Sequence, residues 1–177
     1  MDKKELRKAI REQKRAMTEA EIVAASQRLG ELFLQCEQYK AAKTIYGYLP
    51  YNQEVRTVPM LEQAMKDGKR VAVPKCYGDE MKFIYMDDLS KVEKGYANIP
   101  EPIADDPVAE DPAALVLMPG LAFTTDGKRM GYGGGFYDKF LAAEPGHPTV
   151  ALCYAFQMVE DLPTEDYDIP VDCVLWA

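Results

Sequence analysis

Apolar residues at helical spacing predict two helices at the start of the chain. Over residues 2–16, Leu6, Ala9 and Ile10 fall on one side, and Met17 continues that side. Thr18-Glu19-Ala20-Glu21 is a capping box, in which each of the outer two side chains bonds the other's backbone amide. It begins a second helix, whose apolar stripe consists of Ile22, Ala25, Leu29, Leu32 and Phe33.

Further along, short β-rich apolar runs predict strands, and longer mixed runs predict helices. The strands are expected at residues 44–49, 70–74, 81–86, 114–118, 150–154 and 173–176. A helix begins at Thr57, with Pro59 in its first turn, and ends at Gly68. Another covers residues 136–143, and the proline-rich segment 98–113 is expected to be irregular.

Strands that alternate with helices favour an α/β fold with a mostly parallel sheet covered on both faces. The length of 177 residues suits a single domain. We therefore expect one domain over residues 1–177, in which residues 1–36 form a helical arm packed on the α/β body.

The formal charge of −8 argues against binding of nucleic acid or anionic membrane through bulk electrostatics. Charge is uneven, however, because residues 1–16 carry seven basic side chains against three acidic ones. The four cysteines show no metal-binding spacing, and we see neither a signal peptide nor an apolar run of membrane-spanning length. We expect a cytoplasmic monomer that acts on small molecules.

The most specific feature is the glycine-rich loop over residues 120–135, directly after the apolar strand 114–118. In open α/β sheets, ligands bind beyond the carboxyl ends of the strands. Glycine lets the backbone approach an anion closely, and a helix N-terminus favours phosphate. Lys128 and Arg129 add positive charge, while Asp138 in the next helix suits a Mg²⁺ held between carboxylate and phosphate. These residues indicate a phosphate site, with a flexible glycine hinge as the alternative.

The run MPGLAFTTDGKRMGYGGGFYDKFL, residues 118–141, resembles the signature of the 5-formyltetrahydrofolate cyclo-ligase family. The resemblance extends to KKELR at 3–7, to EVRT at 54–57, to NIPEP at 98–102 and to YDIPVD at 167–172. Phe136, Met130 and Tyr167 depart from the residues common in the family.

The resemblance implies a three-layer α/β/α sandwich, similar to the sugar-phosphate isomerase and CoA-transferase group. It also implies an ATP- and Mg²⁺-dependent ligase that converts 5-formyltetrahydrofolate to 5,10-methenyltetrahydrofolate and releases ADP and phosphate. Phosphorylation of the formyl oxygen would activate the formyl carbon, and the folate N10 would then close the ring.

Residue roles follow from the same resemblance. Arg129 and Lys128 are the expected catalytic residues, and Asp138 and Asp172 the expected Mg²⁺ ligands. The residues expected to bind ATP are Lys3, Lys4, Arg7, Arg129, Met130, Gly131, Tyr132, Gly133, Gly134, Gly135, Phe136 and Tyr137. Those expected to bind the folate are Leu49, Glu54, Tyr132, Phe136, Tyr137 and Tyr154.

Two other functions fit the same residues. The protein could bind 5-formyltetrahydrofolate without turnover, although a pure binder needs no phosphate-gripping Lys3, Arg7 and Arg129. It could also be a different small-molecule phosphotransferase. The folate-type loop around Glu54 argues against that alternative.

Overall fold

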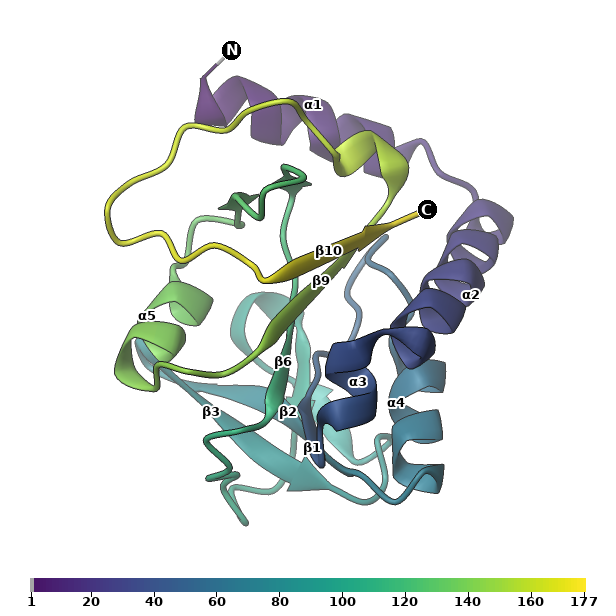
Figure 1. Cartoon of the computed structure of the whole chain (residues 1–177), viewed down its shortest axis with the longest axis vertical. Coiled ribbons are helices and arrows are strands. Elements are labelled where there is room, and N and C mark those ends of the chain that lie inside the picture. The colour runs from purple at the N-terminus through teal and green to yellow at the C-terminus, as the bar shows by residue number, and fades with distance from the viewer. Residues whose placement is uncertain (1) are drawn as a thin grey trace.

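A computed structural model describes residues 2–177 (Figure 1). The α-helices are α1 (Lys3–Arg15), α2 (Glu19–Gln35), α3 (Glu37–Ala41), α4 (Val58–Lys66) and α5 (Phe136–Ala143). Two 3₁₀ helices are η1 (Tyr96–Asn98) and η2 (Ala155–Gln157). The strands are β1 (Thr44–Tyr46), β2 (Arg70–Tyr77), β3 (Glu80–Met86), β4 (Val92–Lys94), β5 (Pro100–Pro102), β6 (Leu115–Met118), β7 (Ala122–Phe123), β8 (Arg129–Met130), β9 (Thr149–Cys153) and β10 (Cys173–Trp176).

Six of these strands form the central sheet, in the order β10-β9-β6-β1-β2-β3. All neighbouring pairs run parallel except β2 and β3, which form an antiparallel pair at one edge. The predicted mostly parallel sheet is confirmed. Its five parallel strands bring their carboxyl ends to one edge, where the segments after β1, β6 and β9 begin.

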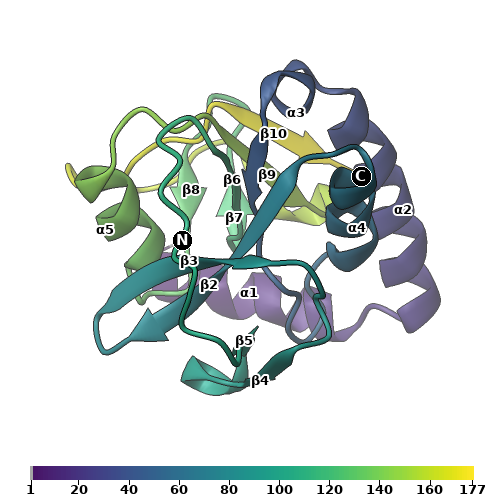
Figure 2. The ribbon, with the colours of Figure 1, turned by 90° about the horizontal axis from the view of Figure 1, so that it is seen from below.

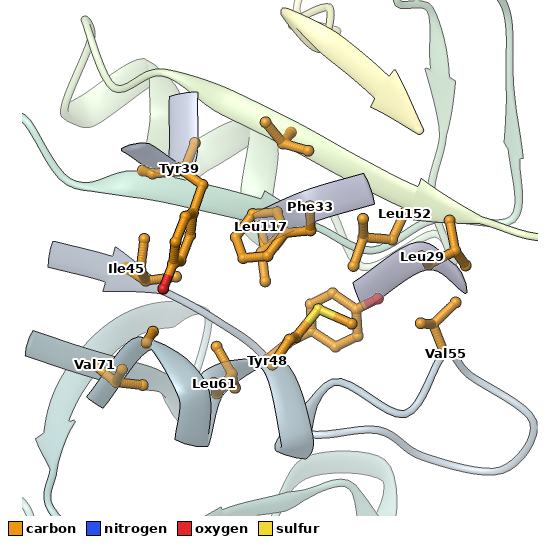
Figure 3. Close-up of a cluster of buried hydrophobic side chains, with 14 of the residues drawn as sticks. Leu29, Phe33, Tyr39, Ile45, Tyr48, Val55, Leu61, Val71, Leu117 and Leu152 are labelled. Atoms are coloured by element: carbon orange, nitrogen blue, oxygen red, sulfur yellow. The ribbon is translucent and has the colours of Figure 1, made fainter. Parts of the chain in front are cut away.

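One face of the sheet is covered by α2, α3 and α4 (Figure 2). Leu29 and Phe33 of α2 and Leu61 of α4 are fully buried there against the sheet residues Leu117 and Leu152 (Figure 3). The apolar stripe predicted for the second helix is therefore a core stripe at these positions. Leu32 is the exception, because 42% of it is exposed.

The opposite face is covered by α5 and by extended segments of chain. Phe140 and Leu141 of α5 pack there with Phe83, Met118 and other buried residues of the sheet. The rings of Phe83 and Phe140 meet edge to face, with 4.9 Å between their centroids. Helices and sheet thus form the three layers that were predicted, with the α5 layer the thinner one.

Helix α1 lies apart from both layers, across the end toward which β6 and β9 run (Figure 1). Its buried residue Ile10 packs with Leu121 and Met130 of the segment after β6, and with Leu162 of the segment after β9. An Asp2 capping box starts the helix, and Ala16 ends it. The arm therefore places a basic helix over the carboxyl edge of the sheet.

Several boundaries differ from the predicted ones. Strand β1 ends at Tyr46, so Leu49 lies beyond it, and β2 continues past Pro74 to Tyr77. Pro74 is tolerated because the pairing of β2 with β1 stops at Ala72. The segment 98–113 and the glycine loop, expected to be irregular, contain β5, β7 and β8, which form small hairpins. Within residues 2–177, no helix combines the length and apolar character needed to cross a membrane.

Candidate functional site

A cavity of about 540 Å³ opens at the carboxyl edge of the sheet. Helix α1 forms one wall, the residues after β1 a second, the glycine loop with the start of α5 a third, and the η1–β5 segment the fourth. The predicted site residues that line it are Lys3, Arg7, Leu49, Glu54, Arg129, Met130, Gly131, Tyr132, Gly133, Gly134, Gly135, Phe136, Tyr137 and Asp138. The structure thus gathers most of the predicted site from three separate stretches of sequence.

Two positions in the glycine loop favour glycine, one through its backbone angle and one through a close neighbour. Gly135 is the N-cap of α5 and has a left-handed backbone, with φ of 72°. A Cβ on Gly131 would lie 2.9 Å from Nη1 of Arg129. These glycines let the loop turn into α5 while it stays against the arginine, so the first amides of the helix border the cavity.

Arg129 is an enclosed cation of the site, with 7% of its side chain exposed. Its Nη1 donates to the Pro119 carbonyl at 3.0 Å, and its Nη2 lies 3.4 Å from Oδ2 of Asp138. The guanidinium also lies over the Tyr137 ring, 5.9 Å from its centroid. Its Nε is buried without a hydrogen-bond partner among residues 2–177. A rigidly held guanidinium with a donor to spare is suited to an anionic ligand.

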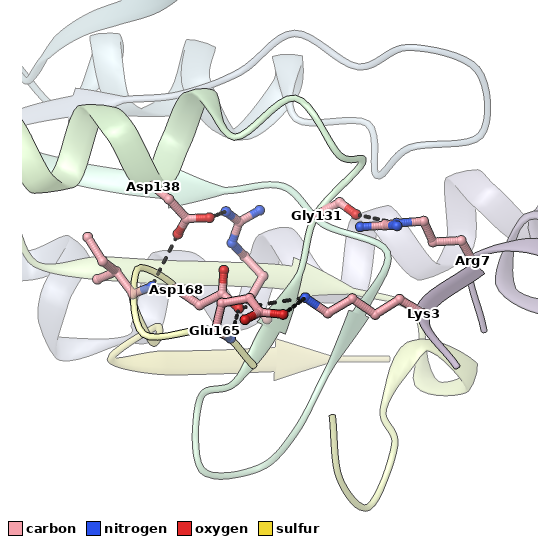
Figure 4. A network of polar contacts seen from close by, with 8 residues as sticks. Lys3, Arg7, Gly131, Asp138, Glu165 and Asp168 are labelled. Carbon is pink, nitrogen blue, oxygen red and sulfur yellow. Dashed lines mark hydrogen bonds and ion pairs between the residues drawn. The ribbon is translucent and has the colours of Figure 1, made fainter. Parts of the chain in front are cut away.

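Helix α1 presents a row of cations to the cavity. Arg7 Nε donates to the Gly131 carbonyl at 3.2 Å, and Lys3 Nζ lies 3.9 Å from Asp168 and 4.0 Å from Glu165 (Figure 4). Arg11, Lys14 and Arg15 also line the cavity. None of these three was predicted from the sequence, although the i, i+4 spacing from Lys3 to Arg7 continues to Arg11 and Arg15 and could have indicated those two.

Glu54 sits in the loop after β1 and is largely enclosed. Its Oε1 accepts from the Tyr51 amide at 2.8 Å, and its Oε2 accepts from the Tyr132 hydroxyl at 3.1 Å. Burial raises the pKa of Glu54, and the nearby positive charge of Lys14 opposes that rise. Leu49 lines the cavity from the same loop, so this wall combines an apolar surface with one acceptor.

Aromatic rings form the rest of the wall. Phe136 and Tyr96 meet edge to face with their centroids 5.1 Å apart, and burial raises the pKa of Tyr137. Tyr96 belongs to the η1 segment, which sequence analysis assigned no role. No signal in the sequence placed it beside Phe136, because the contact depends on how the β4–β5 hairpin folds over the site.

Four predicted site residues do not line the cavity. Lys4 is exposed on α1, and Lys128 forms an ion pair with Asp161, with 2.7 Å between Nζ and Oδ1. Tyr154 is buried behind the Glu54 loop, where its hydroxyl donates to the Gln53 carbonyl at 2.6 Å. It therefore supports the loop from outside the cavity rather than lining it.

Asp172 is the fourth, and its position separates the two predicted metal ligands. It accepts from the Thr149 amide at 2.9 Å, at the amino end of β9, whereas the cavity lies at the carboxyl ends. Asp138 lines the cavity, but it accepts from the Ile169 amide at 3.2 Å and contacts Arg129. The structure does not bring the two carboxylates together.

Within residues 2–177, no cluster of three or more acidic, histidine or cysteine side chains forms a ready-made metal site. Mg²⁺ nevertheless needs few protein ligands, because it keeps several waters and shares the phosphates of its substrate. Asp138 alone therefore fits a Mg²⁺ that arrives with a nucleotide, and Asp172 does not fit such a site.

The cavity combines several cations and the N-terminus of α5 with a carboxylate in an aromatic wall. Such a site in a parallel α/β sheet defines an enzyme that binds a phosphorylated molecule beside an organic acceptor.

The comparisons with known proteins specify which enzyme class this is. The sequence pattern of the 5-formyltetrahydrofolate cyclo-ligase family matches residues 1–177, so the chain belongs to that family. Its members are ATP-dependent ligases that convert 5-formyltetrahydrofolate to 5,10-methenyltetrahydrofolate. The resemblance found in the sequence, and with it the predicted ligase activity, is confirmed.

Individual relatives agree along nearly the whole chain. The 5-formyltetrahydrofolate cyclo-ligase of Escherichia coli K12 is 30% identical over 173 residues, covering 94% of this chain and 95% of its own. The mouse enzyme of the same name is 27% identical, covering 98% and 93%. The solved 5,10-methenyltetrahydrofolate synthetase of Aquifex aeolicus superposes with a TM-score of 0.85 at 28% identity, covering 99% of this chain and 90% of its own.

Proposed function

We propose that the cavity holds ATP and 5-formyltetrahydrofolate together and transfers the terminal phosphoryl group onto the formyl oxygen. The observation that carries this proposal is the shape of the site. One cavity borders Lys3, Arg7, Arg129 and the glycine loop, and it also borders Leu49 and Glu54. Phosphoryl transfer between two small molecules requires both in one enclosure, in line with each other.

The triphosphate binds where cations and backbone donors converge. Lys3 and Arg7 come from α1, Arg129 from β8, and the amides of Gly131–Gly135 from the loop. Lys3 is near Asp168 and Glu165 at about the limit of an ion pair, so a more highly charged triphosphate can compete for it. The buried Nε of Arg129 supplies a donor that no group within residues 2–177 uses.

The folate binds at the Glu54 wall. A pterin ring carries N–H donors that a carboxylate accepts, and Leu49 with the aromatic rings of Phe136 and Tyr137 can cover its faces. In this proposed orientation the substituent on N5 would face the glycine loop, where the phosphoryl donor would bind.

The chemistry consists of two displacements. The formyl oxygen attacks the γ-phosphorus, the bond to the β-bridging oxygen breaks, and ADP departs. The folate N10 then adds to the activated formyl carbon, N10 loses its proton, and phosphate leaves with the electrons of the C–O bond. Arg129 neutralises the charge that develops on the transferred group, and the cavity walls hold N10 near the carbon.

Mg²⁺, when bound with ATP, would neutralise phosphate charge, and Asp138 is the residue that would hold it. Asp138 accepts from the Ile169 amide and from Arg129, and both contacts fix the direction of its carboxylate. Asp138 thereby also orients Arg129 in the absence of any ligand.

The test is direct. The protein is incubated with 5-formyltetrahydrofolate, ATP and Mg²⁺, and the absorbance of the methenyl product is followed while ADP is quantified. Equal amounts of methenyl product and ADP support the proposal. Tight folate binding without product would instead identify a sequestering protein, and ADP release without methenyl product a different phosphotransferase.

Two further proposals concern the setting of the enzyme. We propose the cytoplasm as its location, because Cys36, Cys76, Cys153 and Cys173 are all free thiols, which persist in reducing compartments. The monomeric state stays a prediction. Light scattering tests it, because the measured molar mass distinguishes a monomer from a dimer.

A further inference from the structure

Lys14 is a buried cation at the back of the cavity to which no role has been assigned. The residue lies in the last turn of α1 and is 6% exposed. Its Nζ donates to the Tyr132 hydroxyl at 3.2 Å, and within residues 2–177 the ammonium forms no direct ion pair. A buried ammonium with three donors and one neutral acceptor is costly to maintain, so its position calls for a physical reason.

The Tyr132 hydroxyl connects Lys14 to the folate wall. It accepts from Lys14 and donates to Oε2 of Glu54 at 3.1 Å, so the three side chains form one relay. Lys14 comes from α1, Tyr132 from the glycine loop and Glu54 from the loop after β1. Burial disfavours the charged forms of both ends, lowering the pKa of Lys14 and raising that of Glu54, while each end's charge favours the other's.

The two loops joined by this relay are the two halves of the proposed substrate site. Tyr132 is flanked by Gly131 and Gly133, which border the nucleotide end, and Glu54 is the acceptor at the folate end. A nucleotide that orders the glycine loop also fixes Tyr132, which holds one Glu54 oxygen. We infer that Lys14 is a positioning residue that, through Tyr132 and Glu54, couples nucleotide binding to folate binding.

The inference rests on the proposed function and has a measurable consequence. The first ligand to bind orders the three side chains of the relay, so the second ligand loses less conformational entropy when it binds. Each ligand therefore tightens the binding of the other by the same factor. The coupling factor is the ratio of the dissociation constants of 5-formyltetrahydrofolate without and with the nucleotide. For the wild-type protein we expect a factor of about ten, within the usual range for coupled sites.

The experiment is calorimetric titration of 5-formyltetrahydrofolate in the absence and presence of a non-hydrolysable ATP analogue with Mg²⁺. Lys14→Met keeps the buried stem and removes the charge, and Tyr132→Phe removes only the bridging hydroxyl. In both variants the coupling factor should fall to about one to two, and the double variant should be no worse, because the residues act as one unit. Lys8→Met is the matched control, since Lys8 is an exposed residue of α1 outside the cavity.

The outcomes separate the inference from the function on which it rests. A wild-type factor near one, or an undiminished factor in a folded Lys14→Met or Tyr132→Phe protein, overturns the coupling role alone. An equal fall of the coupling factor in Lys8→Met also overturns the coupling role of Lys14, because the effect would then follow from the overall charge of α1. Wild-type protein that binds neither ligand would instead remove the proposed function itself.

Discussion

At the scale of single residues, Arg129 shows how enclosure prepares a charged group for its ligand. The Pro119 carbonyl, the Asp138 carboxylate and the Tyr137 ring hold the guanidinium from three sides. Such a group has little freedom to lose when an anion binds, so its charge acts at full effect in the transition state.

Arg129→Ala is therefore expected to lower kcat by about a hundredfold to a thousandfold, the usual effect of losing one preorganised donor. Steady-state assay of methenyl product gives the number, and Lys139→Ala, an exposed change on α5, serves as the control. Arg129→Lys should recover little, because an ammonium cannot reproduce the planar fork. Full activity in Arg129→Ala would remove this residue from the reaction.

The raised pKa of Glu54 predicts that the free energy of unfolding depends on pH. Burial raises its pKa above the ordinary value of 4.5, so the folded chain binds this proton more tightly than the unfolded chain. The charged carboxylate consequently costs stability as pH rises from the ordinary pKa through the raised one, and that cost is absent below both.

Glu54→Gln removes this cost along with the folate acceptor. The free energy of unfolding of the variant, relative to wild type, should be more favourable at about pH 7 than at about pH 4. Urea denaturation at the two pH values measures the difference, while titration with 5-formyltetrahydrofolate should show weakened binding. A stability difference that is independent of pH would contradict the raised pKa.

At the scale of secondary-structure elements, α1 joins stability to function along one side of the helix, because Lys3, Arg7 and Ile10 follow the i, i+4, i+7 spacing. Ile10 anchors it on Leu121, Met130 and Leu162, while Lys3 and Arg7 reach the cavity. This packing involves a small apolar cluster that is separate from the two clusters on the faces of the sheet. Helix α1 can thus loosen without unfolding of the sheet.

Ile10→Ala should weaken that anchor selectively. We expect faster hydrogen exchange in α1, little change in the amides of β6 and β9, and a several-fold rise in the KM for ATP because Lys3 and Arg7 are held less firmly. Ala9→Gly offers a comparison that lowers helix propensity without removing the Ile10 anchor. Equal protection of α1 in wild type and Ile10→Ala would show that other contacts hold the helix.

At the scale of the whole molecule, the central sheet carries the stability and the loops at its carboxyl edge carry the chemistry. Leu115 and Leu117 of β6 are fully buried on one face, while Val116 and Met118 are fully buried on the other. A strand buried on both faces ties the two helical layers into one core. The single-domain organisation stays a prediction that unfolding experiments can test.

Leu117→Ala creates a cavity in the middle of this core and should lower the free energy of unfolding by about 2–5 kcal/mol. Urea denaturation should show one transition, shifted to lower concentration with an unchanged slope. Leu32→Ala, at a position that is 42% exposed, should change stability by less than about 1 kcal/mol. Two separate transitions would contradict the single-domain prediction.

Local patterns in the sequence determined the main helices, the strands of the central sheet and the position of the glycine loop, but not the small hairpins of β4 with β5 and β7 with β8. Capping boxes, apolar periodicity and glycine spacing extend over a few residues, so they can be recognised without knowledge of the tertiary structure. The family signature at residues 118–141 depends on the same short spacings, which is why the resemblance could be recognised from the residues alone.

Only the tertiary structure decided which charged side chains meet. Lys128 and Arg129 are neighbours in sequence, yet Lys128 pairs with Asp161 and Arg129 turns into the cavity. Asp138 and Asp172 carry the same group, yet Asp138 lines the cavity and Asp172 accepts from the Thr149 amide at the amino end of β9. Lys14, Tyr132 and Glu54 form a relay across positions far apart in the chain. Such contacts depend on the direction of strands and the docking of α1, which are set by burial of the whole core rather than by any local pattern.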